Sequence, residues 1–284
     1  MQSLVDIWLR RWWRPTPARD EFAGRQPVTV VTGGSEGIGR ALAMQFASLG
    51  NPVMLVARRA GPLEEAAQAI SSKTKVTTFT VVADLSTPAG IAAIDRALAV
   101  RNAYCDILIN NAAMGLAGPF AAQSSEAVSR LIELNIHALT SLMHRHLPGM
   151  LVRGRGGVLN VASLGGYLPG PHQAAYYASK AYVISLTEAV AAENRGQGVR
   201  IAVLAPGPID TKFHQNMGAH GAYYAVLAGL MGADFVARRA LRAFRWGQTV
   251  IIPGLAYRAL SLVVRVLPHP ILAPVTRWLL RTRG

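Results

Sequence analysis

The feature that most constrains the fold is an alternation of short apolar runs with longer helical stretches between residues 26 and 254. The apolar runs are rich in Val, Ile and Leu, which is typical of strands buried on both faces. Strands that alternate with helices form a parallel sheet covered by helices on both sides. We therefore expect one doubly wound α/β domain over residues 26–254. The expected strands are PVTVVTG, NPVMLVARR, TFTVVADLS, DILINNAA, GVLNVAS and RIAVLAPGP, and the expected helices include GRALAMQFASLG, PLEEAAQAISS, GIAAIDRALAV and residues 174–195.

The composition excludes several other classes of protein. With 51% hydrophobic and 15% charged residues among 284, the chain is too apolar to be disordered. Its single cysteine, Cys105, excludes a disulfide framework and a cysteine-rich zinc site, and it fits a reducing, cytoplasmic setting. We expect no metal site, because no acid or thiol completes one at His137, His144 and His146, which we expect to be solvated or to cap helices.

A glycine-rich turn follows the first expected strand and opens the first expected helix, in VVTGGSEGIGRA. Gly33, Gly37 and Gly39 allow a sharp turn and let a pyrophosphate approach the helix N-terminus. Free N–H groups and the helix dipole favour anions there. In its strand–turn–helix context, the turn predicts a dinucleotide-binding site.

The spacing T-G-x-x-x-G-I-G, from Thr32 to Gly39, resembles the signature of the short-chain dehydrogenase/reductase family. The resemblance extends from residue 27 to about residue 254 and is closest in spacing to the family's 3-oxoacyl carrier-protein reductases. It implies a Rossmann-type fold, a nicotinamide cofactor and hydride transfer. The further matches, in family order, are Asp84-Leu85, Asn110-Asn111-Ala112-Ala113 (with alanine where glycine is usual), Asn135, Ser163, Tyr176 with Lys180, and Pro206-Gly207 with Thr211.

The residue types at the matched positions suit proton transfer. Tyr176 and Lys180 are four residues apart in an expected helix, so both side chains lie on one face. An adjacent ammonium stabilises the phenolate and lowers the pKa of a tyrosine, which is about 10 when free. Ser163 supplies a hydroxyl that polarises a substrate carbonyl, and the resemblance implies that Asn135 organises a water linked to Lys180. We predict these four residues as catalytic and Tyr177 as a packing residue or part of the substrate wall.

The end of the second expected strand decides the cofactor. It reads LVARR, with no acid for a ribose 2′-hydroxyl and with Arg58 and Arg59 available to a 2′-phosphate. We therefore predict NADP(H), with Arg58 as the main determinant. Glu36, where many relatives carry a basic residue, either repels the 2′-phosphate or faces solvent. The predicted cofactor contacts are Gly33, Ser35, Glu36, Gly37, Ile38, Gly39, Arg58, Arg59, Asp84, Leu85, Asn111, Ala112, Tyr176, Lys180, Pro206, Gly207, Ile209 and Thr211.

The segment after the Pro-Gly motif, residues 212–232, is apolar, and the family uses this segment as a lid on the substrate. An apolar lid predicts a lipophilic ketone or alcohol, although lids are also apolar simply because they pack on the sheet. The apolar lid residues are Phe213, Met217, Tyr223, Tyr224, Leu227, Leu230 and Met231.

Two basic segments flank the domain: an N-terminal arm, residues 1–25, and a C-terminal extension, residues 255–284. The chain carries a net charge of +14, and no acidic residue follows Asp234, whereas nine arginines do. Such segments suit an anionic membrane surface, an oligomer interface or a cover over the substrate pocket. Nucleic acid is disfavoured, because no nucleic-acid fold accompanies the charge. No segment reads as a membrane span, and the first residues do not read as a signal peptide.

The sequence thus predicts an NADP(H)-dependent short-chain dehydrogenase/reductase that acts on a lipophilic carbonyl or secondary alcohol and forms a homo-oligomer. A 3-oxoacyl reductase acting on carrier-bound or CoA-bound chains is an alternative. A non-catalytic cofactor sensor that docks to a membrane or partner is a third, but a sensor has no need of the Ser163–Tyr176–Lys180 set.

Overall fold

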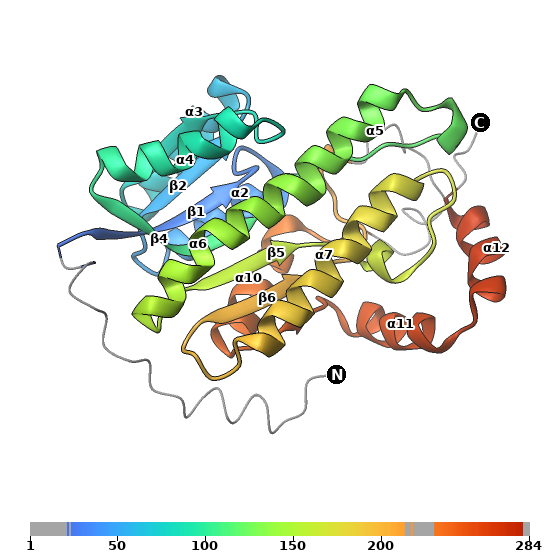
Figure 1. Ribbon diagram of the computed structural model, residues 1–284. Helices are drawn as coiled ribbons and strands as arrows, with labels where there is room; N and C mark the ends of the chain where they lie inside the picture. Colours follow the sequence, from blue (N-terminus) through green and yellow to red (C-terminus); the bar gives the residue numbers. More distant parts are fainter. Residues whose placement is uncertain (1–21, 23, 214–216, 218–229, 281–284) are drawn as a thin grey trace.

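The computed structural model describes residues 22, 24–213, 217 and 230–280, and it contains one seven-stranded parallel sheet flanked by helices (Figure 1). The strands are β1 (Gln26–Thr32), β2 (Val53–Ala57), β3 (Thr78–Val82), β4 (Ala103–Asn110), β5 (Gly157–Val161), β6 (Arg200–Leu204) and β7 (Val250–Ile251). The α-helices are α2 (Gly37–Ala47), α3 (Ala60–Thr74), α4 (Pro88–Val100), α5 (Ser125–Ile132), α6 (Leu139–Arg153), α7 (Ala174–Glu193), α10 (Ala233–Arg245), α11 (Leu255–Val266) and α12 (His269–Leu279). Shorter helical segments are η2 (Phe120–Ala122), η3 (Glu133–Ala138) and η4 (Leu164–Tyr167).

The strand order is β3-β2-β1-β4-β5-β6-β7, which confirms the predicted Rossmann-type fold. The chain moves from β1 outward to β3, returns to β4 beside β1, and then moves outward in the other direction. In such sheets, ligands bind outside the carboxyl ends of the strands, at the point where the order reverses. The edge formed by the ends of β1 and β4 is therefore where a site is expected.

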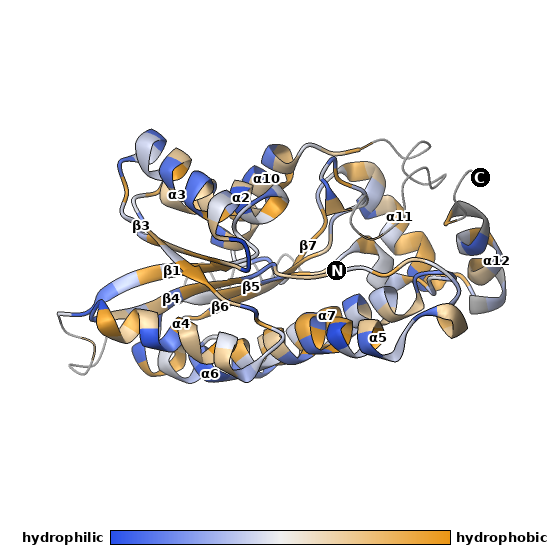
Figure 2. Cartoon of the chain, turned by 90° about the horizontal axis from the view of Figure 1, so that it is seen from above, coloured by the Kyte–Doolittle hydropathy of each residue, from blue (hydrophilic) through white to orange (hydrophobic). Residues whose placement is uncertain are grey.

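Two helical layers cover the sheet (Figure 2). Helices α2, α3 and α10 lie on one face, where Phe46, Leu63 and Val236 belong to one buried cluster with the sheet. Helices α4, α6 and α7 lie on the other face, where Ile94 and Leu142 belong to a second buried cluster. Because both faces are covered, the central strands need apolar side chains in both directions, which explains their continuous Val, Ile and Leu runs.

The C-terminal extension forms two helices, α11 and α12. Of its prolines Pro268, Pro270 and Pro274, only Pro268 lies between the helices, where the chain breaks. Pro270 lies in the first turn of α12, where its missing N–H removes no intrahelical bond, and Pro274 lies within the helix. Of the N-terminal arm, only residues 22, 24 and 25 are among those described. No helix in the described ranges is long and apolar enough to cross a bilayer.

Candidate active site

The predicted acid–base pair lies at the start of α7. Tyr176 and Lys180 are both buried, with exposed fractions of 9% and 3%. The Lys180 Nζ lies 5.7 Å from the centroid of the Tyr176 ring and donates to the carbonyl of Val161 over 3.0 Å. Burial lowers the pKa of Lys180 to about 8, so that it is mostly an ammonium at neutral pH. A buried cation thus adjoins the tyrosine, at the carboxyl end of β5.

Asn135 is fixed by hydrogen bonds to two other parts of the site. Its Nδ2 donates to the Met114 carbonyl over 2.8 Å and to the Ser179 Oγ over 3.1 Å, while its Oδ1 accepts from the Met114 N–H over 2.8 Å. The Ser179 Oγ in turn donates to the carbonyl of Tyr176 over 2.7 Å. Asn135 lies in η3, a π-helical turn, and such turns are frequent at functional sites. Asn135 therefore ties the loop after β4 to the helix that carries Tyr176.

Ser163 follows β5 and caps η4. Its Oγ accepts from the N–H of Gly165 over 3.1 Å, which leaves the O–H able to donate to a substrate oxygen. The next residue, Leu164, donates its N–H to the Pro206 carbonyl over 2.8 Å. The serine loop and the Pro-Gly segment are thus joined at the carboxyl edge of the sheet.

An apolar wall surrounds Tyr176. Leu131 and Met217 are buried against it, and the Phe213 ring lies 5.5 Å from its ring. The Tyr177 ring packs against Gly165 and Gly170, in line with a packing role. Of the predicted lid residues, Tyr223, Tyr224 and Leu227 lie outside the described residues. Other partly buried members of the wall are Met114, Leu116, Ala117 and Ala175.

The glycine turn has the shape that an anion site needs. Gly33 and Gly37 have φ angles of +65° and +57°, which residues with side chains rarely adopt. A Cβ at Gly39 would overlap the carbonyl oxygen of Gly33. Glu36 precedes α2 without a side-chain capping bond, and the first turn of α2 contains no acid. Ser35 lies in the turn, and Ile38 packs on the core. The backbone N–H groups at this N-terminus of α2 suit a pyrophosphate.

The neighbouring strand holds this turn in place. The Thr32 Oγ1 accepts from the N–H groups of Asn111 (2.9 Å) and Ala112 (3.0 Å), just after β4. The Asn111 Nδ2 donates back to the carbonyls of Thr32 (3.0 Å) and Gly33 (3.1 Å). Asn111, predicted as a cofactor contact, thus uses its amide N–H groups to position the turn.

Arg58 and Arg59 differ in their partners. The Arg59 Nη2 lies 2.9 Å from the Glu36 Oε1, and the Glu36 side chain is 42% exposed, so Glu36 faces solvent and is paired with Arg59 at the start of α3. Its effect on a 2′-phosphate stays a prediction. Arg58 is exposed and makes no ion pair within the described part of the chain. Arg58 is the arginine that remains available to a phosphate.

Asp84 and Leu85 follow β3 on the same side of the sheet. Asp84 accepts hydrogen bonds from the N–H and Oγ of Ser86, and its Oδ2 lies 3.1 Å from Nη2 of Arg130. Burial raises the pKa of Asp84, but the Ser86 bonds and the nearby charges of Arg130 and Arg58 together hold it below its usual value. Leu85 is buried. The Asp84 carboxylate is thus kept charged and oriented.

The Pro-Gly segment closes the other side of the crevice. Thr211 reaches the glycine turn, its Cγ2 lying 3.3 Å from where a Gly37 Cβ would be. Ile209 is buried and forms a β-bridge with Met231. Gly207 packs against the ring of Tyr257, from α11. Segments 33–39 and 206–211, distant in sequence, therefore meet.

Comparison with known proteins agrees with this geometry. The family model described as short chain dehydrogenase matches residues 27–221. The chain belongs to the short-chain dehydrogenase family. A short-chain dehydrogenase from Sphingobium yanoikuyae, solved in complex with NADPH, is 32% identical, with a TM-score of 0.75 over 84% of this chain and 92% of that chain.

Two further relatives from the short-chain dehydrogenase family differ from the S. yanoikuyae protein, the first in its bound cofactor and the second in its named activity. One from Burkholderia phymatum, solved in complex with NAD, is 25% identical, with a TM-score of 0.75 over 84% of this chain and 92% of that chain. A very-long-chain 3-oxoacyl-CoA reductase of Laccaria bicolor is 33% identical over 200 residues, which are 69% of this chain and 59% of the relative. The chain is thus a short-chain oxidoreductase that acts on carbonyl or alcohol groups.

Two residues of this short-chain dehydrogenase site were not predicted from the sequence. Ser179 links Asn135 to α7. The only feature of the sequence that could have indicated it is a polar residue three positions after Tyr176, on the buried face of the helix. Arg130 contacts Asp84 from α5, a helix that the apolar pattern does not predict, and no sequence feature connects the two residues.

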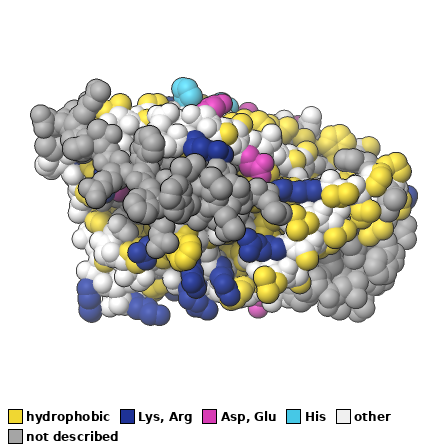
Figure 3. Space-filling view, turned by 90° about the horizontal axis from the view of Figure 1, so that it is seen from below, with side chains coloured by type: hydrophobic (Ala, Val, Ile, Leu, Met, Phe, Trp, Pro, Cys, Tyr) yellow, Lys and Arg dark blue, Asp and Glu magenta, His cyan; other side chains and the backbone are white. Residues whose placement is uncertain are grey.

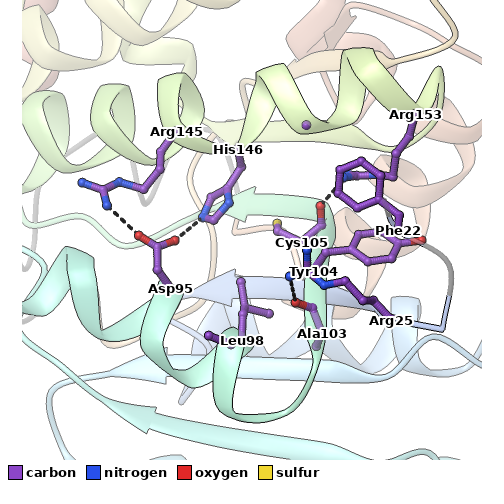
Figure 4. A pocket seen from close by; sticks show the side chains of 12 residues that line it. Phe22, Arg25, Asp95, Leu98, Ala103, Tyr104, Cys105, Arg145, His146 and Arg153 are labelled. Atoms are coloured by element: carbon purple, nitrogen blue, oxygen red, sulfur yellow. Dashed lines mark hydrogen bonds and ion pairs between the residues drawn. The ribbon is translucent and has the colours of Figure 1, made fainter. Parts of the chain in front are cut away.

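A cavity of about 230 Å³ lies at the opposite, amino edge of the sheet, between α4, α6 and the start of β4 (Figure 4). The guanidinium of Arg153 stacks there on the rings of Phe22 and Tyr104. His146, expected to be solvated or capping, is instead largely buried, with its Nε2 3.6 Å from the Asp95 Oδ1. Burial lowers the pKa of His146. The Asp95 carboxylate raises it, and the charges of Arg145 and Arg153 lower it further. None of the predicted site residues lines this cavity.

Proposed function

We propose that the chain is an NADP(H)-dependent reductase or dehydrogenase that interconverts a lipophilic ketone and its secondary alcohol. The observation that carries the proposal is the buried ammonium of Lys180 beside the Tyr176 ring, at the same carboxyl edge of the sheet as a glycine turn with an open helix N-terminus. A buried ammonium without an acidic hydrogen-bond partner is energetically unfavourable, so its retention fits a role in the chemistry.

The residues around the glycine turn fit a dinucleotide. Gly33, Gly37 and the open start of α2 suit the pyrophosphate, and Asp84 with Leu85 suits the adenine side. Arg58 supports NADP(H), because the only acid near it on the turn, Glu36, is compensated by Arg59. The family binds both cofactors, as the NADPH complex from S. yanoikuyae and the NAD complex from B. phymatum illustrate. The preference for NADP(H) therefore rests on Arg58.

The nicotinamide, when bound, supplies or accepts the hydride. In the reductive direction, Tyr176 donates its phenolic proton to the substrate oxygen as the carbonyl carbon is reduced. The Lys180 ammonium stabilises the phenolate that this leaves, and the Ser163 O–H donates to the same substrate oxygen. Asn135 holds α7 against the loop after β4, which keeps Tyr176 in position. Oxidation of the alcohol reverses each proton movement.

The apolar wall supports a lipophilic substrate. Leu131, Phe213 and Met217 pack around Tyr176, so the surroundings of its ring are hydrocarbon rather than polar. A 3-oxoacyl chain is a second candidate, supported by the same wall and by the similarity to the L. bicolor 3-oxoacyl-CoA reductase. We further propose that the protein is a cytoplasmic homo-oligomer.

The test starts with binding. Purified protein is titrated with NADPH and NADH by energy transfer from tryptophan, and NADPH oxidation is then followed with bulky ketones and long-chain 3-oxoacyl-CoA esters. Tyr176→Phe should lower kcat by about 100-fold or more, the usual contribution of an acid–base group, while the variant still binds NADPH.

Tyr182→Phe is the matched control, because Tyr182 lies on the same helix but is 37% exposed and contacts Thr140. It should keep normal turnover. Full activity of Tyr176→Phe, or no binding of either cofactor, would contradict the proposal. Turnover of the acyl-CoA esters but not of the ketones would favour the second candidate.

A further inference from the structure

Helix α11 turns an apolar stripe toward solvent. Leu255, Leu262 and Val266 lie on one face at helical spacing and are 83%, 48% and 82% exposed. Val263, next to this stripe, is 52% exposed. Exposed apolar residues are common singly, but four on one short helix form a continuous surface that marks an interaction site.

The opposite face of α11 fixes this orientation. Val264 and Ser261 are buried, and the ring of Tyr257 packs on Gly207. The Arg265 guanidinium lies 4.3 Å from the centroid of the Tyr167 ring, and its Nη2 lies 3.6 Å from the Glu188 Oε1. These four inward contacts turn the stripe to solvent, and helix α11 itself lies at the lower right of Figure 1.

Arginines flank the stripe. Arg258 and Arg265 follow one edge of α11, and within the described part of the chain Arg265 alone among the arginines of α10 to α12 has an acidic partner. The face seen from below exposes basic side chains across its middle and lower left and hydrophobic ones most densely at its right (Figure 3). The exposed arginines of these three helices are Arg238, Arg239, Arg242, Arg245, Arg258, Arg265 and Arg277.

We infer that the outward face of α11, with Arg258 at its edge, docks on an anionic lipid surface. A helix with an apolar stripe and a basic flank lies in the plane of a membrane interface, where the stripe enters the acyl boundary and the arginines meet lipid phosphates. A second copy fits less well. A two-fold contact of α11 against itself would bring Arg258 of one copy toward the basic edge of the other, because neither α11 nor α12 carries an acidic residue.

This docking would bring the membrane close to the proposed active site. The inner face of α11 contacts Gly207 of the Pro-Gly segment and Tyr167 of η4, the segment that Ser163 caps. A lipophilic ketone dissolved in the bilayer would therefore be presented near the serine loop. This consequence rests on the proposed function, but the docking itself requires no turnover.

The test is co-sedimentation of the full chain with vesicles of phosphatidylcholine alone and of phosphatidylcholine with phosphatidylglycerol at 7:3. We expect binding to the mixed vesicles only, and weaker binding at high salt. Leu262→Glu with Val266→Glu should weaken it more than tenfold. Arg258→Gln should weaken it about fivefold, the effect of about 1 kcal/mol per basic residue.

Matched controls lie on α4. Val100→Glu alters a residue that is 85% exposed, and Arg96→Gln removes an exposed charge, so both should bind as the native chain does. Unchanged NADPH binding and thermal unfolding verify that each variant is folded. Equal binding to both vesicle types overturns the inference, as does full binding by the α11 variants. A smaller mass of the Leu262→Glu/Val266→Glu variant in light scattering, with vesicle binding retained, would also overturn it and assign the face to a second copy.

Discussion

Replacing Lys180 by methionine should make the fold more stable while it abolishes turnover. The ammonium is 3% exposed, and burial alone accounts for the lowering of its pKa from 10.5 to about 8. The folded state therefore disfavours the charged form that the active site uses. Methionine has a similar length and leaves no charge to desolvate.

The magnitude follows from the difference between the two pKa values. At pH 7 the buried charge costs about 3 kcal/mol of folding free energy, at about 1.4 kcal/mol per pKa unit. Loss of the hydrogen bond to the Val161 carbonyl offsets about 1 kcal/mol. We expect a net gain of about 2 kcal/mol for Lys180→Met at pH 7.

The gain should depend on pH with a definite sign. Between pH 8 and 10.5 the unfolded chain binds more protons than the folded one, so the native protein becomes more stable as the pH rises. The advantage of Lys180→Met should thus fall by about 2 kcal/mol between pH 7 and pH 9.5. Urea unfolding of both proteins at these two pH values measures it. A difference that stays constant with pH would refute the reasoning, as would substantial residual turnover in the variant.

Three further predictions concern the cofactor site. Arg58→Ala should weaken NADPH binding about tenfold and leave NADH binding unchanged in fluorescence titrations, since one phosphate contact contributes about 1.5 kcal/mol; equal losses for both cofactors would contradict this. Gly39→Ala should abolish NADPH binding, because its Cβ overlaps the Gly33 carbonyl, whereas Gly61→Ala, whose Cβ meets nothing within 4 Å, should bind normally and unfold at a slightly higher temperature. Thr32→Val should lower the free energy of unfolding by about 2 kcal/mol in urea, because it removes the acceptor of two backbone N–H groups after β4. An unchanged urea midpoint would contradict this role of Thr32.

Most of the sheet could be predicted from the sequence because its strands are continuous apolar runs. β1, β2 and β5 are bounded by turn residues, and a strand covered on both faces leaves no ambiguity about which side is buried. β7 could not be predicted in this way, because Val250–Ile251 is too short to show any period. Its pairing with β6 depends on α10 returning the chain to the edge of the sheet.

The members of the site were predictable by their spacing, but their partners were not. Tyr176 and Lys180 share a face of α7 by helical geometry alone. The Glu36–Arg59 ion pair joins residues 23 positions apart across the glycine turn, so its presence depends on how α3 begins. His146 shows the same limit, because its burial against Asp95 is set by the packing of α6 on α4.

The fastening of the glycine turn by Thr32 and Asn111 also affects the entropy of cofactor binding. Ordering the backbone of one residue costs about 1 to 2 kcal/mol in conformational entropy. Because β4 already holds the turn, that ordering occurs once, when the chain folds, and not at each round of binding. Substitutions that loosen the junction of β1 and β4 should therefore weaken dinucleotide binding through an unfavourable entropy change, even where no residue that touches the ligand is altered.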